Sequence, residues 1–120
     1  MEELQRHQHR IHVGARLLLN TGWDKSFKSG NYYEDFPCLT LEAAEYLVDR
    51  KISLLGLDTP SPSPLDDPGQ LIHKTLLGAG IVILESVKNL TLIESDVCEL
   101  VVLPLPLKDF SGSPCRVVAR

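Results

Sequence analysis

Short runs of apolar residues alternate with polar, glycine-rich or proline-rich stretches along this chain, and each run predicts one element. The stretch ARLLLN predicts a buried strand over residues 16–20, which the following Thr-Gly pair would end. Residues 24–37 are polar and aromatic, and they predict an exposed loop. A second buried strand is predicted in ISLLGLD, and it ends near Asp58.

Between these two strands the sequence predicts one helix, which opens after Thr40 and closes at residues 49–51. The Thr40 hydroxyl can accept a hydrogen bond from a free N–H group of the first turn, and the Glu42 carboxylate suits the positive end of the helix dipole. Helical spacing then gives one apolar face, made by Leu41, Ala44, Leu47 and Val48.

The second half of the chain begins with the proline-rich stretch TPSPSPLDDPG, residues 59–69. It predicts a long loop, because proline lacks the N–H group that a helix or a sheet needs. Residues 71–77 predict a short helix, which Gly78 and Gly80 would end. Further strands are predicted at residues 81–85, 98–103 and 115–119. This order of elements predicts a mixed α/β (α+β) fold.

Composition limits the classes of protein. A chain of 120 residues suits one domain, and we expect a polar, histidine-containing tail over 1–13 and a single domain over 14–120. A net charge of −4 argues against a nucleic-acid partner. The apolar runs are too short to cross a membrane, and the polar start differs from a secretory signal. The three cysteines have no CxxC spacing, which favours reduced thiols, so we expect a cytoplasmic protein.

The stretch HKTLLGAGIVILES carries the candidate chemistry, with His73 at its start and Glu85 near its end. Each residue alone has an ordinary interpretation. A lone histidine on a short helix is usually a surface or hydrogen-bonded core residue, and a glutamate at the end of a strand is usually solvated. Two donors also fall short of a closed zinc site, which takes three or four protein ligands.

Four blocks of the sequence together resemble the C-terminal half of the cyclase family of metal-dependent hydrolases, which includes bacterial kynurenine formamidase and isatin hydrolase. The blocks are LLLNTGWDKSF, YYEDFPCLTLEAAEYLVDRKISLLGLDTPS, HKTLLGAGIVILESVKNL and LPLPLKDFSGSPCRVVAR. The resemblance covers residues 14–120 and implies a domain of the swivelling β/β/α type. It implies arylformamidase-like hydrolysis of a small aromatic amide, such as N-formylkynurenine or a cyclic amide, by metal-activated water. It also implies that His73 and Glu85 bind a divalent metal, Zn or Mn.

One motif of the resembled family is missing from this sequence. H-x-G-T-H-x-D-x-P-x-H carries the family's other metal ligands and its acid/base histidine, and the spacing of His7, His9 and His12 does not reproduce it. We therefore expect a chain that lacks the N-terminal half of the family fold, as a truncated product, as a split subunit or through a wrongly assigned start. Such a chain would form a homodimer or a complex with a separately encoded N-terminal half. The alternative is a catalytically inactive binding or assembly module that keeps the fold.

Two further hypotheses concern the surroundings of the site. The aromatic residues Trp23, Tyr32, Tyr33 and Phe36 could line a substrate pocket, or they could pack on the core or at a dimer interface. Asp58 could hydrogen-bond a metal-binding histidine, or it could cap the proline-rich loop.

Overall fold

The computed structural model describes all residues from 1 to 120, and these form two compact units, Met1–Leu90 and Thr91–Arg120. The first unit contains the parallel sheet, its helices and the candidate site. The mixed α/β fold predicted from the pattern of the sequence is confirmed. No helix in the structure is both long enough and apolar enough to cross a membrane.

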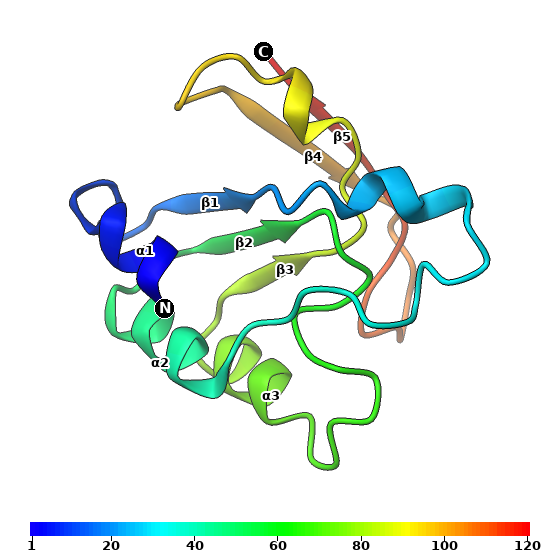
Figure 1. Ribbon diagram of the computed structural model, residues 1–120, viewed down its shortest axis with the longest axis horizontal. Coiled ribbons are helices and arrows are strands. Elements are labelled where there is room, and N and C mark those ends of the chain that lie inside the picture. Colours follow the sequence, from blue (N-terminus) through cyan, green and yellow to red (C-terminus); the bar gives the residue numbers. More distant parts are fainter. The chain divides into compact units, whose positions relative to one another are not determined.

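The sheet of the first unit has three parallel strands in the order β1-β2-β3 (Figure 1). These strands are β1 (Arg16–Leu19), β2 (Leu54–Leu57) and β3 (Val82–Leu84), and each lies within a predicted strand. The central strand β2 is buried at every position, as expected for a parallel strand covered on both faces. A Cβ added at Gly56 would lie 2.5 Å from Leu18 Cδ2, so the small residue permits close packing against β1.

Two helices lie side by side along one side of this sheet (Figure 1). They are α2 (Leu41–Asp49) and α3 (Leu71–Gly78). The predicted cap of α2 is confirmed, because Thr40 Oγ1 accepts a hydrogen bond of 3.1 Å from the Ala43 N–H. After α3 the chain turns at Gly80, whose φ of +77° is a conformation that glycine adopts without strain. The most deeply buried side chains of the core include Ala44, Leu47, Leu55 and Leu76.

The N-terminal segment differs from the polar tail expected over residues 1–13. It forms α1 (Glu2–Arg6) and a 3₁₀-helix (Gln8–Arg10), and it joins the core of the first unit. Leu4 and Ile11 are 8% and 4% exposed, although polar residues surround both of them in sequence. These two side chains and the partly buried Met1 pack against the core, while the histidines and charged residues of the segment are exposed.

The second unit, residues 91–120, contains an antiparallel pair of strands. These are β4 (Leu100–Pro104) and β5 (Cys115–Ala119), and Val102 lies opposite Val117. Both were predicted, and β4 extends one residue further, to Pro104 at its end. Three apolar side chains of this pair are well exposed: Val101, Leu103 and Val118. An isolated two-stranded pair is only marginally stable in water, so such a surface favours contact with other polypeptide.

The two adjacent leucines near the end of α3 give a matched test of the core. Leu76 is fully buried, whereas Leu77 is 55% exposed. We expect Leu76→Ala to lower the free energy of unfolding by about 2–5 kcal/mol, because it leaves a cavity against the sheet. Leu77→Ala should change it by less than about 0.5 kcal/mol. Urea unfolding of both variants measures the difference, and equal losses would contradict the described packing of α3.

Candidate functional site

Parallel strand register brings the candidate residues to one edge of the sheet. Gly56 of β2 lies opposite Leu84 of β3, so Asp58 and Glu85 both follow directly after the ends of neighbouring strands. The loop that leaves β2 over residues 59–69 leads into α3, which carries His73 in its first turn. The carboxyl end of an open parallel sheet is the usual place for a ligand site in α/β folds.

His73 and Glu85 meet at this edge. The Nε2 atom of His73 lies 3.3 Å from Oε1 of Glu85, and the other ring nitrogen, Nδ1, lies 2.9 Å from the Ser63 hydroxyl. The two side chains are 27% and 40% exposed, so small solutes can reach the pair. The two residues lie twelve positions apart in the sequence, and they meet because α3 and the end of β3 lie at the same edge of the sheet.

The proline-rich loop is less exposed than its composition suggests. Thr59, Ser61 and Ser63 are 1%, 6% and 2% exposed. Thr59 Oγ1 donates to the Ser61 carbonyl oxygen at 3.0 Å, and the Ser63 N–H donates to Ser61 Oγ at 3.1 Å. Polar groups can be buried here because each hydroxyl has a hydrogen-bond partner.

Asp58 was expected to contact a metal-binding histidine or the proline-rich loop, but it bonds the segment that follows β1. Its buried carboxylate accepts hydrogen bonds from the Thr21 N–H, the Thr21 hydroxyl at 2.7 Å and the Trp23 N–H at 2.9 Å. These contacts fix the turn after β1 and the start of a 3₁₀-helix (Trp23–Lys28). Ser63, rather than Asp58, makes the hydrogen bond to His73. Sequence reasoning missed Ser63, because a serine in a proline-rich stretch is typical of an ordinary loop.

Of the four aromatic residues expected to line a substrate pocket, Trp23 and Tyr32 instead make hydrogen bonds to the backbone. Tyr32 is 3% exposed, and its hydroxyl donates to the Asp58 carbonyl oxygen and contacts Ser86 Oγ at 3.1 Å. Trp23 Nε1–H donates to the Tyr32 carbonyl oxygen at 2.9 Å. Burial raises the pKa of Tyr32, and the hydrogen bond to Ser86 opposes this rise. The charges of Tyr33, Asp58 and Asp24 add to it. The expectation of an exposed loop over 24–37 thus fails at Tyr32 and Phe36, which are both buried.

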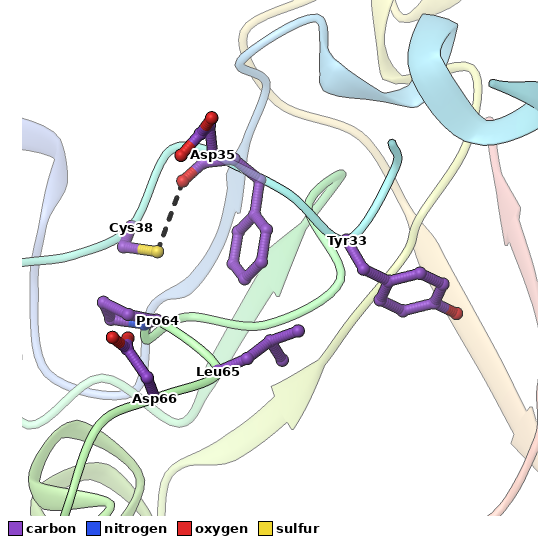
Figure 2. A pocket seen from close by; sticks show the side chains of 7 residues that line it. Tyr33, Asp35, Cys38, Pro64, Leu65 and Asp66 are labelled. Atoms are coloured by element: carbon purple, nitrogen blue, oxygen red, sulfur yellow. Dashed lines mark hydrogen bonds between the residues drawn. The ribbon is translucent and has the colours of Figure 1, made fainter. Parts of the chain in front are cut away.

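The other two aromatic residues, Tyr33 and Phe36, line a pocket of about 450 Å³ (Figure 2). Figure 2 shows Cys38 and Asp66 at one end of this pocket and Tyr33 at the other. Burial raises the pKa of the Cys38 thiol, and the Asp66 charge adds to the effect. The complete lining consists of Tyr33, Asp35, Phe36, Cys38, Pro64, Leu65 and Asp66.

The spacing of His73 and Glu85 fits two donors to one metal ion. Two atoms that each lie about 2.0–2.1 Å from zinc at a tetrahedral angle are roughly 3.3 Å apart, and the His73–Glu85 distance is 3.3 Å. The bond from Nδ1 to Ser63 leaves Nε2 directed toward Glu85, as in metal sites where a second partner orients the ring. No group of three or more His, Cys, Asp or Glu side chains in the chain could hold a metal. The remaining donors would have to come from water or from other polypeptide.

Solved structures with this fold include two that are described as metal-dependent hydrolases. One described as a potential metal-dependent hydrolase with cyclase activity superposes with a TM-score of 0.78 at 26% identity, over 97% of this chain and 56% of that one. Isatin hydrolase A from Ralstonia solanacearum has a TM-score of 0.78 at 28% identity, over 98% of this chain and 49% of that one. The fold is therefore that of this class of hydrolase.

Sequence comparison identifies the family. The Cyclase family model matches residues 1–64, and the chain belongs to this family. Kynurenine formamidase of Bacillus mycoides (strain KBAB4) is 40% identical over 88% of this chain and 49% of its own length. Kynurenine formamidase of Bacillus cytotoxicus is 37% identical over all of this chain and 55% of its own length. The chain thus spans about half the length of these relatives.

The contacts of Asp58 predict that its charge is required for the turn after β1. In Asp58→Asn one acceptor oxygen becomes an NH₂ group that faces N–H donors, and we expect a loss of about 1–3 kcal/mol in the free energy of unfolding. Asp66→Asn, the same change at an exposed site, should cost less than about 0.5 kcal/mol. Trp23, the single tryptophan, reports the unfolding by fluorescence. Equal stability of the two variants would contradict the assigned role of Asp58.

The raised pKa of Tyr32 predicts a loss of stability at alkaline pH. Because the folded-state pKa lies above the ordinary value of 10.0, the contribution of Tyr32 is fully present below pH 10. As the pH rises through the ordinary value and toward the folded-state pKa, the unfolded chain loses its proton more readily, and the contribution is lost. Tyr32→Phe should remove this part of the pH dependence, whereas Tyr33→Phe should keep most of it, because burial and not the Tyr33 charge is the largest cause of the raised pKa. Urea midpoints measured from pH 8 to 11 test this, and an unchanged slope in Tyr32→Phe would refute it.

Proposed function

We propose that this chain supplies part of the active site of a metal-dependent hydrolase that cleaves small aromatic amides. The observation that carries the proposal is the convergence of His73 Nε2 and Glu85 Oε1 at 3.3 Å, on a ring whose other nitrogen is already held by Ser63. A neutral imidazole and a carboxylate suit Zn²⁺ or Mn²⁺. Such an ion, when bound, would acidify a water molecule and polarise a carbonyl oxygen for hydrolysis. The names kynurenine formamidase and isatin hydrolase among the relatives support an aryl amide substrate, N-formylated or cyclic.

The pocket supports the aromatic part of this proposal. Tyr33 and Phe36 supply aromatic walls, which suit an aryl group. The opposite wall begins at Pro64, one residue after Ser63, which contacts His73. A single stretch of loop therefore connects the proposed binding surface with the proposed metal ligand. Trp23 and Tyr32 do not line the pocket, and in this proposal they support the loop that carries Tyr33 through their hydrogen bonds.

A complete site in this proposal includes polypeptide beyond these residues. Two donors leave a metal with an incomplete set of ligands. In this proposal the other polypeptide supplies both the missing donors and the residue that transfers the proton. The partner is a second copy of the chain or a segment equivalent to the rest of the relatives. The exposed apolar side chains of β4 and β5 favour such an association, because covering them removes apolar surface from water. The two-donor count also favours the alternative, a binding or assembly module without turnover.

The metal ligands can be tested by calorimetric titration with Zn²⁺ and Mn²⁺. We expect binding weaker than about 1 μM, because closed structural zinc sites contribute about 10–16 kcal/mol through a full set of ligands and this pair offers only two. His73→Ala and Glu85→Ala should each abolish the measurable heat. His12→Ala, which changes an exposed histidine outside the site, should leave it unchanged. Tight binding that disappears in Glu85→Ala would instead show a complete site within the chain.

Turnover separates the hydrolase from the binding module. The chain should be assayed on N-formyl aromatic amines with Zn²⁺ or Mn²⁺, alone and together with the remaining half of a full-length relative. Hydrolysis by the combination that is lost in His73→Ala supports the proposal. No hydrolysis at any metal concentration, in a combination shown to associate, favours the module without turnover.

A further inference from the structure

A row of buried hydroxyl groups leads from the end of β2 to His73. Thr59, Ser61 and Ser63 alternate with Pro60 and Pro62, and all three hydroxyl-bearing residues are at least nine-tenths buried. The row ends at the ring, where Ser63 Oγ lies 2.9 Å from His73 Nδ1.

The position of Ser63 is fixed by the backbone around it. The Pro62 carbonyl oxygen accepts a hydrogen bond of 2.8 Å from the Leu39 N–H, and the Thr59 carbonyl oxygen accepts one of 2.9 Å from the Ser86 N–H. Proline fixes φ at two positions of this stretch, and a residue that precedes a proline, as Ser63 precedes Pro64, is restricted as well. The Ser63 hydroxyl therefore meets a ring nitrogen from a place that the loop determines.

A hydroxyl group is suited to this position because it can both donate and accept a hydrogen bond. A neutral ring that faces the acceptor-only carboxylate of Glu85 carries its proton on Nε2, and Ser63 then donates to Nδ1. When Nε2 gives its lone pair to a cation, the single ring proton belongs on Nδ1 and needs an acceptor. Ser63 Oγ can accept there without any movement of the loop.

We propose that Ser63 is a positioning residue that holds the His73 ring with Nε2 toward Glu85 and serves both neutral tautomers of that ring. The part that concerns the cation rests on the proposed function. The part that concerns the orientation of the ring rests on the chain alone. Ser63 itself touches neither substrate nor metal in this scheme.

The metal-free protein tests the orientation of the ring. Nitrogen-15 NMR of histidine-labelled protein, recorded at about pH 8.5 where imidazole groups are ordinarily neutral, should show a shifted and exchange-broadened His73 Nδ1 resonance in Ser63→Ala. Ser63→Thr, which keeps the hydroxyl, should restore the wild-type resonance. Ser53→Ala is the matched control, because that hydroxyl donates to the Gly14 carbonyl oxygen and does not contact His73. An Nδ1 resonance that is the same in wild type and Ser63→Ala would overturn the proposal.

Zinc affinity tests the second tautomer. Loss of the partner of a metal-binding histidine typically lowers affinity by about 10–100-fold, and we expect at least about a tenfold loss in Ser63→Ala and no loss in Ser53→Ala. Equal losses in both variants would show a general effect on stability and would overturn this role of Ser63. If wild-type His73 does not respond to Zn²⁺ at all, the proposed function fails, while the metal-free spectra still decide whether Ser63 positions the ring.

Discussion

The parallel pairing of β2 with both of its neighbours is the constraint on which the site depends. Because β2 lies between β1 and β3, residues that follow the three strands emerge at one edge of the sheet. The Asp58 carboxylate, after β2, bonds Thr21 after β1, and Glu85 follows the end of β3. The helix α3 packs beside α2 and brings its first turn, with His73, over the same edge.

Buried polar groups, rather than additional apolar packing, give this edge its shape. The Asp58 carboxylate, the Tyr32 hydroxyl and the hydroxyl groups of residues 59–63 are all hydrogen-bonded within the structure. Such a network is costly when any member is left without a partner, so it specifies one arrangement of the surrounding loops. The partly exposed pair His73 and Glu85 thus comes from a helix and from the end of a strand, and elements of this kind hold two ligand atoms at a fixed separation better than loops do.

Family membership and the geometry of the site support the functional proposal in different ways. Membership of the Cyclase family is established by the match over residues 1–64, and the relatives connect the fold with hydrolases. The geometry adds that His73 and Glu85 lie at a separation suitable for one ion. It also adds that residues 64–66 of the proline-rich loop line a pocket with aromatic walls. Neither supplies a full set of metal ligands, which is why the proposed site includes further polypeptide.

The sequence by itself determined the elements that local pattern controls. Apolar runs predicted the strands, Thr40 predicted the start of α2, and Gly80 marked the turn after α3, because capping and backbone conformation depend on neighbouring residues. The site was only partly predictable. The possible ligands His73 and Glu85 could be named from residue type and family resemblance, but their meeting at one edge required the register of β2 and β3.

Tertiary structure alone decided which polar groups became partners. Asp58 bonds Thr21 across 37 positions and Tyr32 contacts Ser86 across 54, and no local pattern encodes pairings at such separations. For the same reason Ser63 could not be distinguished from any other loop serine. The burial of Leu4 and Ile11 in an otherwise polar segment was also invisible to the sequence, because it depends on the core that the rest of the unit provides.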